Sequence, residues 1–390
     1  MNNIMAIIKD CRIFDGSQFL DNCELLIRNG QCLSVAEHES NSSTPIIHAQ
    51  GNIICLCFAD LPVNGGGGLM FNDKPSVSAL QTIASAHATL GTRCLLPTLI
   101  TDTAEVTLAA LKATKEAVEE GVPGIAGLHL EGPHLAVEKK GAHDATLIRR
   151  MHDEDLEVLL QAAHDLPVLK VTIAPESVSR AQVNTLVDAG VIVSLGHTNA
   201  DYATCMEYFD AGASCATHLF NAMSQLASRE PGLAGAAIKH PSCVAGVIAD
   251  GIHVHSATLK TAWMAKKGME PKGALGKLFL VTDAMAVAAT SLDSFELQGR
   301  QIYRSHGRLE LEDGTLAGAD LSLLDAIRWL NDSLKIDLPE ALAAAISIPR
   351  YVLYGNEHDC HISGKSVDDI ICINADLKSV KSLQSVIDAA

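Results

Sequence analysis

Residues 125–131 read IAGLHLE, and three further stretches of the same kind follow along the chain. They are VIVSLGH at 191–197, CATH at 215–218 and LFLVTD at 278–283. Each is a short run of β-forming residues ending in a side chain that can bind a metal or move a proton: Glu131, His197, His218 and Asp283. Buried parallel strands have this apolar pattern, and barrels of such strands carry their chemistry at the carboxyl ends. The four stretches indicate one metal-dependent hydrolytic centre.

Strand-like and helical patterns alternate from about residue 53 onward. Eight strands are predicted, at 53–63, 93–99, 125–131, 168–175, 191–197, 215–219, 244–250 and 278–283. Helical patterns lie between most of them, at 77–90, 103–120, 153–164, 179–189, 200–211 and 256–267, and two more follow at 321–334 and 339–347. This alternation predicts an α/β fold with a (β/α)8 TIM-like barrel rather than an open sheet.

The two ends of the chain have a different character. Residues 1–52 contain short strand-like runs with turn signals at Asp15-Gly16 and Asn29-Gly30 between them. A last strand-like run lies at 369–374. We therefore expect a small β-sandwich domain formed by residues 1–52 and 355–390, beside a barrel domain formed by residues 53–354.

Composition excludes several classes of protein. The net charge of -17 argues against a nucleic-acid partner, which requires a basic face. The 11 cysteines are an odd number without a CxxC pair, which is typical of free thiols in a reducing compartment. No apolar run reaches about 18 residues, so no membrane span is expected. The N-terminus shows no secretory signal pattern, so we expect a cytoplasmic protein.

The residues at the strand ends suggest a specific chemistry. Glu131, His197 and His218 form a common three-ligand set for a divalent metal that leaves one position open. Zn²⁺ is expected, and Fe²⁺ is the alternative because two histidines and a carboxylate suit both. Asp283 is expected to move the proton of the attacking water. The plainer alternatives are that Glu131 is a carboxylate of a turn, that the two histidines belong to the core, and that Asp283 caps a helix. For His129 a role in the core is expected.

Ten short motifs in a fixed order carry a family resemblance. They are LPTLI at 96–100, HLEGP at 129–133, KGAH at 140–143, APE at 174–176, GHTNA at 196–200, THLFNAM at 217–223, REPGL at 229–233, ADGIHV at 249–254, LVTDA at 280–284 and GTLAG at 314–318. Together they resemble the amidohydrolase superfamily and, within it, the N-acetylglucosamine-6-phosphate deacetylases. The resemblance implies metal-dependent release of acetate from N-acetylglucosamine-6-phosphate, giving glucosamine-6-phosphate in amino sugar catabolism.

The resemblance also implies roles for individual residues. Glu131, His197 and His218 would hold one metal, Asp283 would be general base and then general acid, and His143 would polarise the acetyl carbonyl. Further residues would bind the phosphorylated N-acetyl amino sugar, with Arg229 and His253 on its phosphate across the interface of a homodimer or dimer-based tetramer. This substrate-binding set comprises Ala142, Asn221, Ala222, Arg229, Asp250, Gly251, Ile252, His253, Leu316, Ala317 and Gly318.

One departure from the superfamily pattern bears on the metal count. Many amidohydrolases carry His-x-His after the first strand and bind a second metal there, but residues 60–65 read DLPVNG. Neither Pro62 nor Asn64 can replace an imidazole, so a single metal is expected. His134 stands where a bulky aromatic residue is common, and a direct role in the pocket stays open.

Three alternatives remain open on the sequence. The first is a deacetylase for N-acetylgalactosamine-6-phosphate, which would use the same residues. The second is another amidohydrolase, for example one acting on cyclic amides. The third is a non-catalytic paralogue on the same barrel, which the complete set of ligands and the acid–base Asp283 disfavour.

Overall fold

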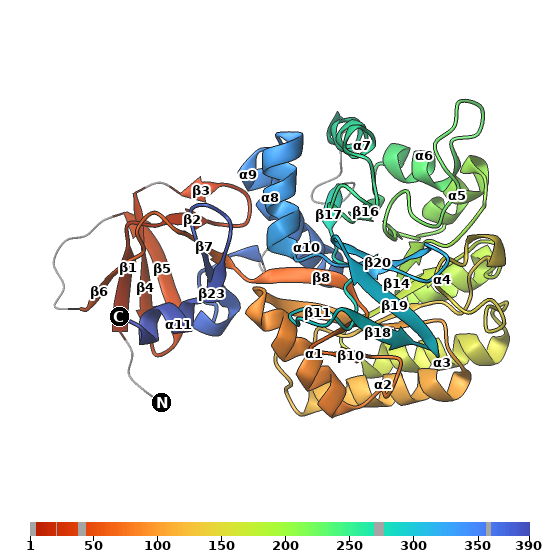
Figure 1. Ribbon diagram of the computed structural model, residues 1–390, viewed down its shortest axis with the longest axis horizontal. Coiled ribbons are helices and arrows are strands. Elements are labelled where there is room, and N and C mark those ends of the chain that lie inside the picture. Colours follow the sequence, from red (N-terminus) through yellow and green to blue (C-terminus); the bar gives the residue numbers. More distant parts are fainter. Residues whose placement is uncertain (1–4, 21, 38–43, 269–276, 356–359) are drawn as a thin grey trace.

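The protein consists of a parallel barrel wrapped by helices and a smaller, mostly β part that carries both termini (Figure 1). The structure is a computed structural model that describes residues 5–20, 22–37, 44–268, 277–355 and 360–390. None of the helices in these ranges is long and apolar enough to span a bilayer.

Eight parallel strands form the barrel, as predicted. They are β8 (Phe58–Val63), β11 (Thr92–Ile100), β12 (Leu128–Glu131), β13 (Leu169–Ile173), β14 (Ile192–Leu195), β15 (Cys215–Ala216), β16 (Val244–Val247) and β17 (Leu278–Leu280). Each pairs in parallel with its neighbour in sequence order. The first and last strands meet through a parallel bridge between Val63 and Ala284, and the Thr282 amide donates to Asp60 at 3.0 Å. The predicted (β/α)8 barrel is confirmed.

Helices cover the outside of the barrel, and one more helix lies close to the C-terminus. Their bounds are α1 (Val77–Thr89), α2 (Ala104–Glu119), α3 (Asp153–Asp165), α4 (Arg180–Asp188), α5 (Tyr202–Asp210), α6 (Gly232–Lys239), α7 (Ser256–Gly268), α8 (Leu323–Leu334), α9 (Leu338–Ala345), α10 (Ser347–Tyr354) and α11 (Leu383–Asp388). Side-chain caps start several of them, for example Ser76 on α1 and Thr103 on α2. The sequence did not predict α6, because residues 232–238 are all buried and show no amphipathic period.

The small β part contains two sheets built from both chain ends. One has the order β5-β4-β1-β6 and the other β23-β22-β7-β2-β3. The strands are β1 (Met5–Lys9), β2 (Arg12–Phe14), β3 (Phe19–Leu20), β4 (Cys23–Arg28), β5 (Gln31–Glu37), β6 (Ile46–His48), β7 (Ile53–Leu56), β22 (Ile370–Ile373) and β23 (Val380–Ser382). The strand at the chain's end does return to the N-terminal unit, because β22 pairs with β7.

The predicted strand at 53–63 is two strands, which is a difference from the sequence reading. The amide of Cys57 donates to Asp369 O in the small β part, while that of Phe58 donates to Gly91 O at the base of the barrel. The chain therefore changes sheets between these residues, and a continuous apolar run cannot reveal such a change.

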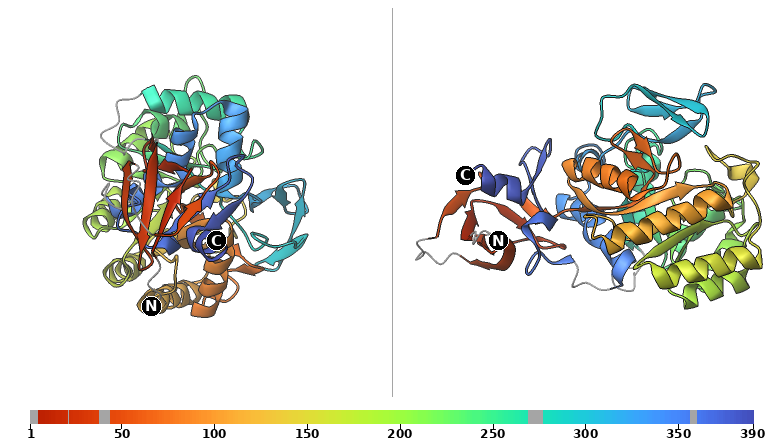
Figure 2. Two further views of the ribbon diagram at one scale, coloured as in Figure 1. Left: turned by 90° about the vertical axis from the view of Figure 1, so that its left-hand side faces the viewer. Right: turned by 90° about the horizontal axis from the view of Figure 1, so that it is seen from below.

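An antiparallel insertion follows the eighth barrel strand and was not predicted. It contains β18 (Ser294–Leu297), β19 (Arg300–Ser305), β20 (Arg308–Glu310) and β21 (Leu316–Ala319). Figure 2 shows these strands as a separate layer beside the barrel. Phe295, Leu297, Ile302 and Leu309 give this insertion an apolar cluster of its own. A short hairpin, β9 (Gly65–Gly66) with β10 (Leu69–Met70), follows the first barrel strand.

Candidate active site

The three side chains predicted to bind a metal converge at the carboxyl end of the barrel. Glu131 Oε1 lies 3.1 Å from His197 Nε2 and 3.0 Å from His218 Nε2, and the two Nε2 atoms are 3.1 Å apart. All three residues are buried. Ligands bound to one tetrahedral zinc at about 2.0–2.1 Å stand roughly 3.3 Å from one another. The triangle therefore has the size that a single divalent ion requires.

The backbone hydrogen bonds of His197 and His218 use Nδ1 and leave Nε2 available to bind a metal. His197 Nδ1 donates to the carbonyl of Lys139 at 2.8 Å, and His218 Nδ1 donates to that of Asn221 at 3.2 Å. Neutral imidazoles held in this way carry their lone pairs on Nε2, which is the state that metal ligands need. Two lone pairs and a carboxylate oxygen then face one point, an arrangement that a cation stabilises. The donor set fits a metal.

The two imidazoles also set the charge of Glu131. Burial would raise the pKa of this carboxyl, but its close contacts with the rings of His197 and His218 bring it well below its usual range. Burial alone would lower the pKa of His218, and the nearby Glu131 raises it instead. Glu131 is therefore present as the carboxylate, the form in which it can bind a cation.

Asp283, the predicted proton carrier, lies in the same cavity. Burial and the nearby charge of Glu131 raise its pKa, while a hydrogen bond from Asn64 opposes the rise. Asn64 Nδ2 donates to Asp283 Oδ1 at 2.7 Å. Asn64 is a residue that the sequence analysis treated only as a missing histidine, and its position at the end of the first barrel strand was the available signal.

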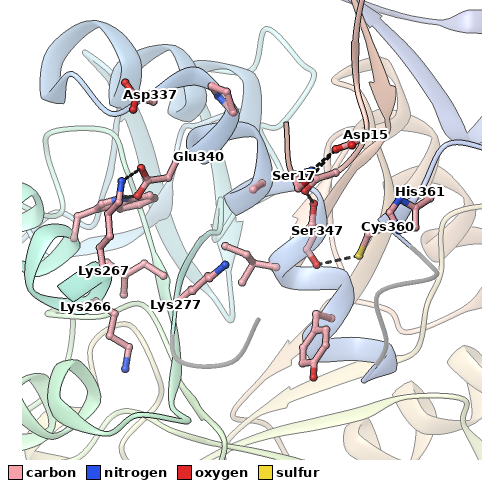
Figure 3. A pocket seen from close by; sticks show the side chains of 17 residues that line it. Asp15, Ser17, Lys266, Lys267, Lys277, Asp337, Glu340, Ser347, Cys360 and His361 are labelled. Carbon is pink, nitrogen blue, oxygen red and sulfur yellow. Dashed lines mark hydrogen bonds and ion pairs between the residues drawn. The ribbon is translucent and has the colours of Figure 1, made fainter. Parts of the chain in front are cut away.

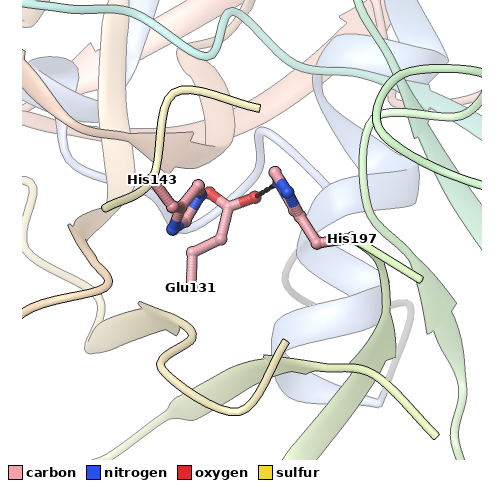
Figure 4. Close-up of side chains that lie close together, drawn as sticks. All are labelled: Glu131, His143 and His197. Carbon is pink, nitrogen blue, oxygen red and sulfur yellow. Dashed lines mark hydrogen bonds and ion pairs between the residues drawn. The ribbon is translucent and has the colours of Figure 1, made fainter. Parts of the chain in front are cut away.

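His143 lies next to the triangle and faces His197. Their ring centroids are 4.4 Å apart. Glu131, His143 and His197 offer ligand atoms that all lie within 4.8 Å of one another, and Figure 4 shows the carboxylate of Glu131 between the two rings. The Thr101 amide donates to His143 Nδ1 at 3.3 Å, and the Thr101 hydroxyl contacts the same atom at 2.8 Å.

These contacts determine which ring nitrogen of His143 carries the hydrogen. Because Nδ1 accepts from the Thr101 amide, the ring hydrogen belongs on Nε2. Burial first, and then the neighbouring His197, hold the pKa of His143 well below its usual range. His143 is therefore a neutral imidazole with an N–H available on the side away from Thr101. Thr101 is a second residue that the sequence analysis missed, since it adjoins the LPTLI motif without belonging to it.

A cavity of about 530 Å³ opens over the metal triangle. This volume is ordinary for a small-ligand site. Besides Glu131, His143, His197, His218 and Asp283, it is lined by six of the predicted substrate-binding residues: Ala142, Asn221, Ala222, His253, Leu316 and Gly318.

The other five predicted substrate-binding residues do not line this cavity. Asp250 acts on His253 instead, with its Oδ2 2.6 Å from His253 Nδ1 and its Oδ1 accepting two backbone amides. The intervening Gly251 and Ile252 belong to the same turn. Ala317 is buried in the apolar cluster of the insertion. Arg229 is exposed in the loop that precedes α6, outside the cavity of its own chain.

The two remaining histidines of this region belong to the surroundings. His129 is buried below the triangle, between the hydroxyls of Thr98 at 3.1 Å and Thr172 at 2.7 Å. This contact pattern fits the expected core role. His134 lines a small separate cavity beside α3, and not the one over the triangle.

A larger cavity of about 650 Å³ lies elsewhere, between α7, α9, α10 and the small β part (Figure 3). None of the predicted site residues lines it. Lys267 and Trp263 both donate to the carboxylate of Glu340 there, each at 2.6 Å. Because this cavity contains none of the predicted site residues, the smaller cavity with the triangle is the candidate site.

Comparison with known proteins agrees with this assignment. The sequence model of the amidohydrolase family matches residues 53–331 of this chain. An N-acetylgalactosamine-6-phosphate deacetylase of Shewanella sp. is 37% identical over 369 residues, which are 94% of this chain and 91% of the relative. An N-acetylglucosamine-6-phosphate deacetylase of Haemophilus influenzae is 34% identical over 338 residues, 85% of this chain and 86% of the relative. The crystal structure of N-acetylglucosamine-6-phosphate deacetylase from Pasteurella multocida has a TM-score of 0.89 at 31% identity and covers 96% of this chain and 97% of its own. The chain therefore belongs to the amidohydrolase family, in the branch whose members are named N-acetylglucosamine- and N-acetylgalactosamine-6-phosphate deacetylases.

Proposed function

We propose that this protein is a metal-dependent deacetylase that converts N-acetylglucosamine-6-phosphate to glucosamine-6-phosphate and acetate. The observation that carries the proposal is the convergence of Glu131, His197 and His218 within 3.1 Å beside Asp283 in one cavity. The names of the relatives supply the substrate class.

The metal in this proposal is a single Zn²⁺, with Fe²⁺ as the alternative that the same ligands suit. Glu131, His197 and His218 would hold it. When bound, such an ion supplies Lewis acidity and makes water reactive near neutral pH. One metal suffices in this proposal because Pro62 and Asn64, at the end of the first barrel strand, offer no imidazole.

The chain's own residues perform the proton transfers and orient the amide. Asp283 takes a proton from the attacking water and later gives it to the departing amine, and its raised pKa suits a group that must both accept and release a proton. His143 donates its Nε2 hydrogen to the acetyl carbonyl oxygen and stabilises the negative charge that develops there. A single donor of this kind typically contributes about 3–4 kcal/mol to the transition state.

We further propose that the phosphate binds His253 and the Arg229 of a second copy in a homodimer. Arginine forms bidentate contacts with phosphate, and Arg229 is exposed rather than turned into its own cavity. None of the eleven cysteines, all of which lie in the described part of the chain, forms a disulfide, which suits a cytoplasmic enzyme.

A second substrate is favoured by one observation. The relative from Shewanella sp., which is 37% identical, is named for N-acetylgalactosamine-6-phosphate. The same cavity could accept that epimer, because the reacting acetamido group and the phosphate are unchanged. Measuring kcat/KM for both sugar phosphates, and for their unphosphorylated forms, decides between the epimers and tests the need for phosphate.

The substitution Asp283→Asn tests the mechanism in metal-loaded protein. The expected result is a fall in kcat for acetate release of at least about 100-fold, because the amide cannot take up the proton. Asp188→Asn, at the exposed end of α4, is the matched control and should retain parental turnover. An Asp283→Asn enzyme that keeps turnover within about tenfold of the parent would show that Asp283 does not carry the proton.

A further inference from the structure

The tip of the antiparallel insertion touches two loops of the active site. Gln298 and Gly299 form the turn between β18 and β19, and both have positive φ, at 48° and 76°. Gln298 Nε2 donates to the carbonyl of Thr101 at 2.9 Å and to Asp102 Oδ2 at 3.1 Å. Arg300, at the start of β19, donates from an Nη atom to the carbonyl of Ala142 at 2.5 Å. The turn thus joins the loop after β11 to the loop of residues 140–143.

The first of these loops contacts His143, and the second carries it. Thr101 holds the Nδ1 atom of the ring through its amide and its hydroxyl, and Ala142 is the preceding residue in the chain. The insertion therefore fixes the ring's hydrogen-bond partner through Gln298 and the ring's own backbone through Arg300. A shift of the tip would move the ring and its partner together.

Apolar packing and further polar contacts hold the insertion in place. The apolar cluster of the insertion includes Ile100, which precedes Thr101, and Met285, which is two residues from Asp283. Ala142 packs against this cluster. Asp102, the second acceptor of Gln298, also accepts from Asn72 Nδ2 at 2.8 Å. At the far end, Arg304 makes a two-point contact with Asp320 at 2.8 and 2.9 Å. These contacts restrain the insertion at both ends.

We propose that Gln298 and Arg300 are positioning residues for His143, so that the insertion sets the point at which the acetyl carbonyl is polarised. The proposal rests on the role given to His143 in the proposed function. A displacement of about 1 Å in a catalytic group can cost about 100-fold in rate, so a contact two residues removed from substrate still acts on turnover. Neither residue lines the cavity, so neither is a substrate contact.

The test compares Arg300→Met and Gln298→Ala with the parent, all loaded with metal. Each should lower kcat by about tenfold or more and change KM by less than about threefold, since the carbonyl is polarised more strongly in the transition state than in the ground state. Metal content should stay at the parental value because the triangle is not touched. Arg308→Met is the matched control: it removes an exposed arginine of the same sheet, whose partner is Glu310 at 3.0 Å, and should leave both constants unchanged.

A double-mutant cycle separates positioning from a general loss of stability. In a His143→Asn background, Arg300→Met should lower kcat by less than about twofold, because the group it positions is gone. If Arg300→Met proves unstable, Gln298→Ala takes its place in the cycle, and Arg300→Lys, which keeps the charge and can still reach a carbonyl, should retain most of the parental kcat. Undiminished effects in the His143→Asn background, or Arg300→Met and Gln298→Ala within twofold of parental kcat, would overturn the proposal. If His143→Asn itself leaves kcat unchanged, the role of His143 in the proposed function fails instead.

Discussion

His134 should make the folded protein sensitive to mild acid. It is 4% exposed, its Nδ1 donates to the carbonyl of Arg149 at 3.1 Å, and its own carbonyl accepts the amide of Ala174 at 2.9 Å. Burial lowers the pKa of His134 to about 4, against 6.5 for an exposed histidine, although the bond to Arg149 and the charge of Asp155 oppose the shift. The native ring therefore stays neutral at pH values at which the unfolded chain already binds a proton.

The sign and size of the effect follow from proton linkage. Because the unfolded state binds more protons between the two pKa values, the free energy of unfolding falls as the pH drops from about 6.5 toward about 4. The full difference of pKa corresponds to about 3 kcal/mol. Between pH 7.5 and pH 5 the expected loss from this residue alone is about 2 kcal/mol.

The assay is urea unfolding of the parent and of His134→Asn at pH 7.5 and pH 5, with metal present. Asparagine places an N–H near the original Nδ1 but does not titrate in this range, so its stability should fall about 2 kcal/mol less than that of the parent over the interval. Comparing the two proteins removes the contribution of the other titrating groups. If the parent and the variant lose stability equally, to within about 0.5 kcal/mol, His134 is not held neutral by the fold and the argument from burial is wrong.

Three further predictions concern the site and the core. Glu131→Gln should lose the bound metal on gel filtration, as measured by elemental analysis, because the amide cannot supply the negative oxygen of the triangle; retention of a full equivalent would contradict the ligand assignment. Asn64→Leu should lower kcat and move the acid limb of the kcat/KM profile to higher pH, because it removes a hydrogen bond that lowers the pKa of Asp283; a limb that stays in place would show that the contact has no role in catalysis. Phe279→Ala, in the 1% exposed middle of β17, should cost about 3–5 kcal/mol in unfolding free energy by urea titration, and a loss below about 1 kcal/mol would mean that the barrel collapses around the cavity.

The architecture was predictable where burial alone decides it. Barrel strands such as β16 and β17 are buried at every position, and their sequences, VAGV and LFL, read as unbroken apolar runs. The insertion lacks that signal because its strands are short and partly exposed: in β19 only Ile302 of six residues is fully buried. The helix α6 was missed for the opposite reason, since burial on all sides leaves no period to detect.

The candidate site was predictable only in its most reactive members. Glu131 and Asp283 stand at the ends of recognisable strands, so their chemistry could be inferred from type and place. The groups that hold them come from distant parts of the chain: Asn64 contacts Asp283 across 219 positions, and Gln298 reaches Thr101 across 197. Asparagine, glutamine and threonine occur in many surface loops, so nothing in their local sequence marks these particular ones. Only the closed barrel brings them to the site.

The backbone at the site explains why three predicted strands were too long. His197, His218 and Asp283 have positive φ angles of 48°, 30° and 52°, a conformation that glycine normally supplies. Each turns the chain out of its strand, so β14 ends at Leu195, β15 at Ala216 and β17 at Leu280, before the functional residue. A left-handed residue with a side chain costs roughly 1–2 kcal/mol, and hydrogen bonds to the three carbonyls from Ala136, Asn221 and Ala319 help to offset that cost. Because the residue that turns the chain is also the residue that carries the chemistry, none of the three turning positions is a glycine. A prediction from the sequence pattern therefore continues each strand to the functional residue, although the strand has ended before it.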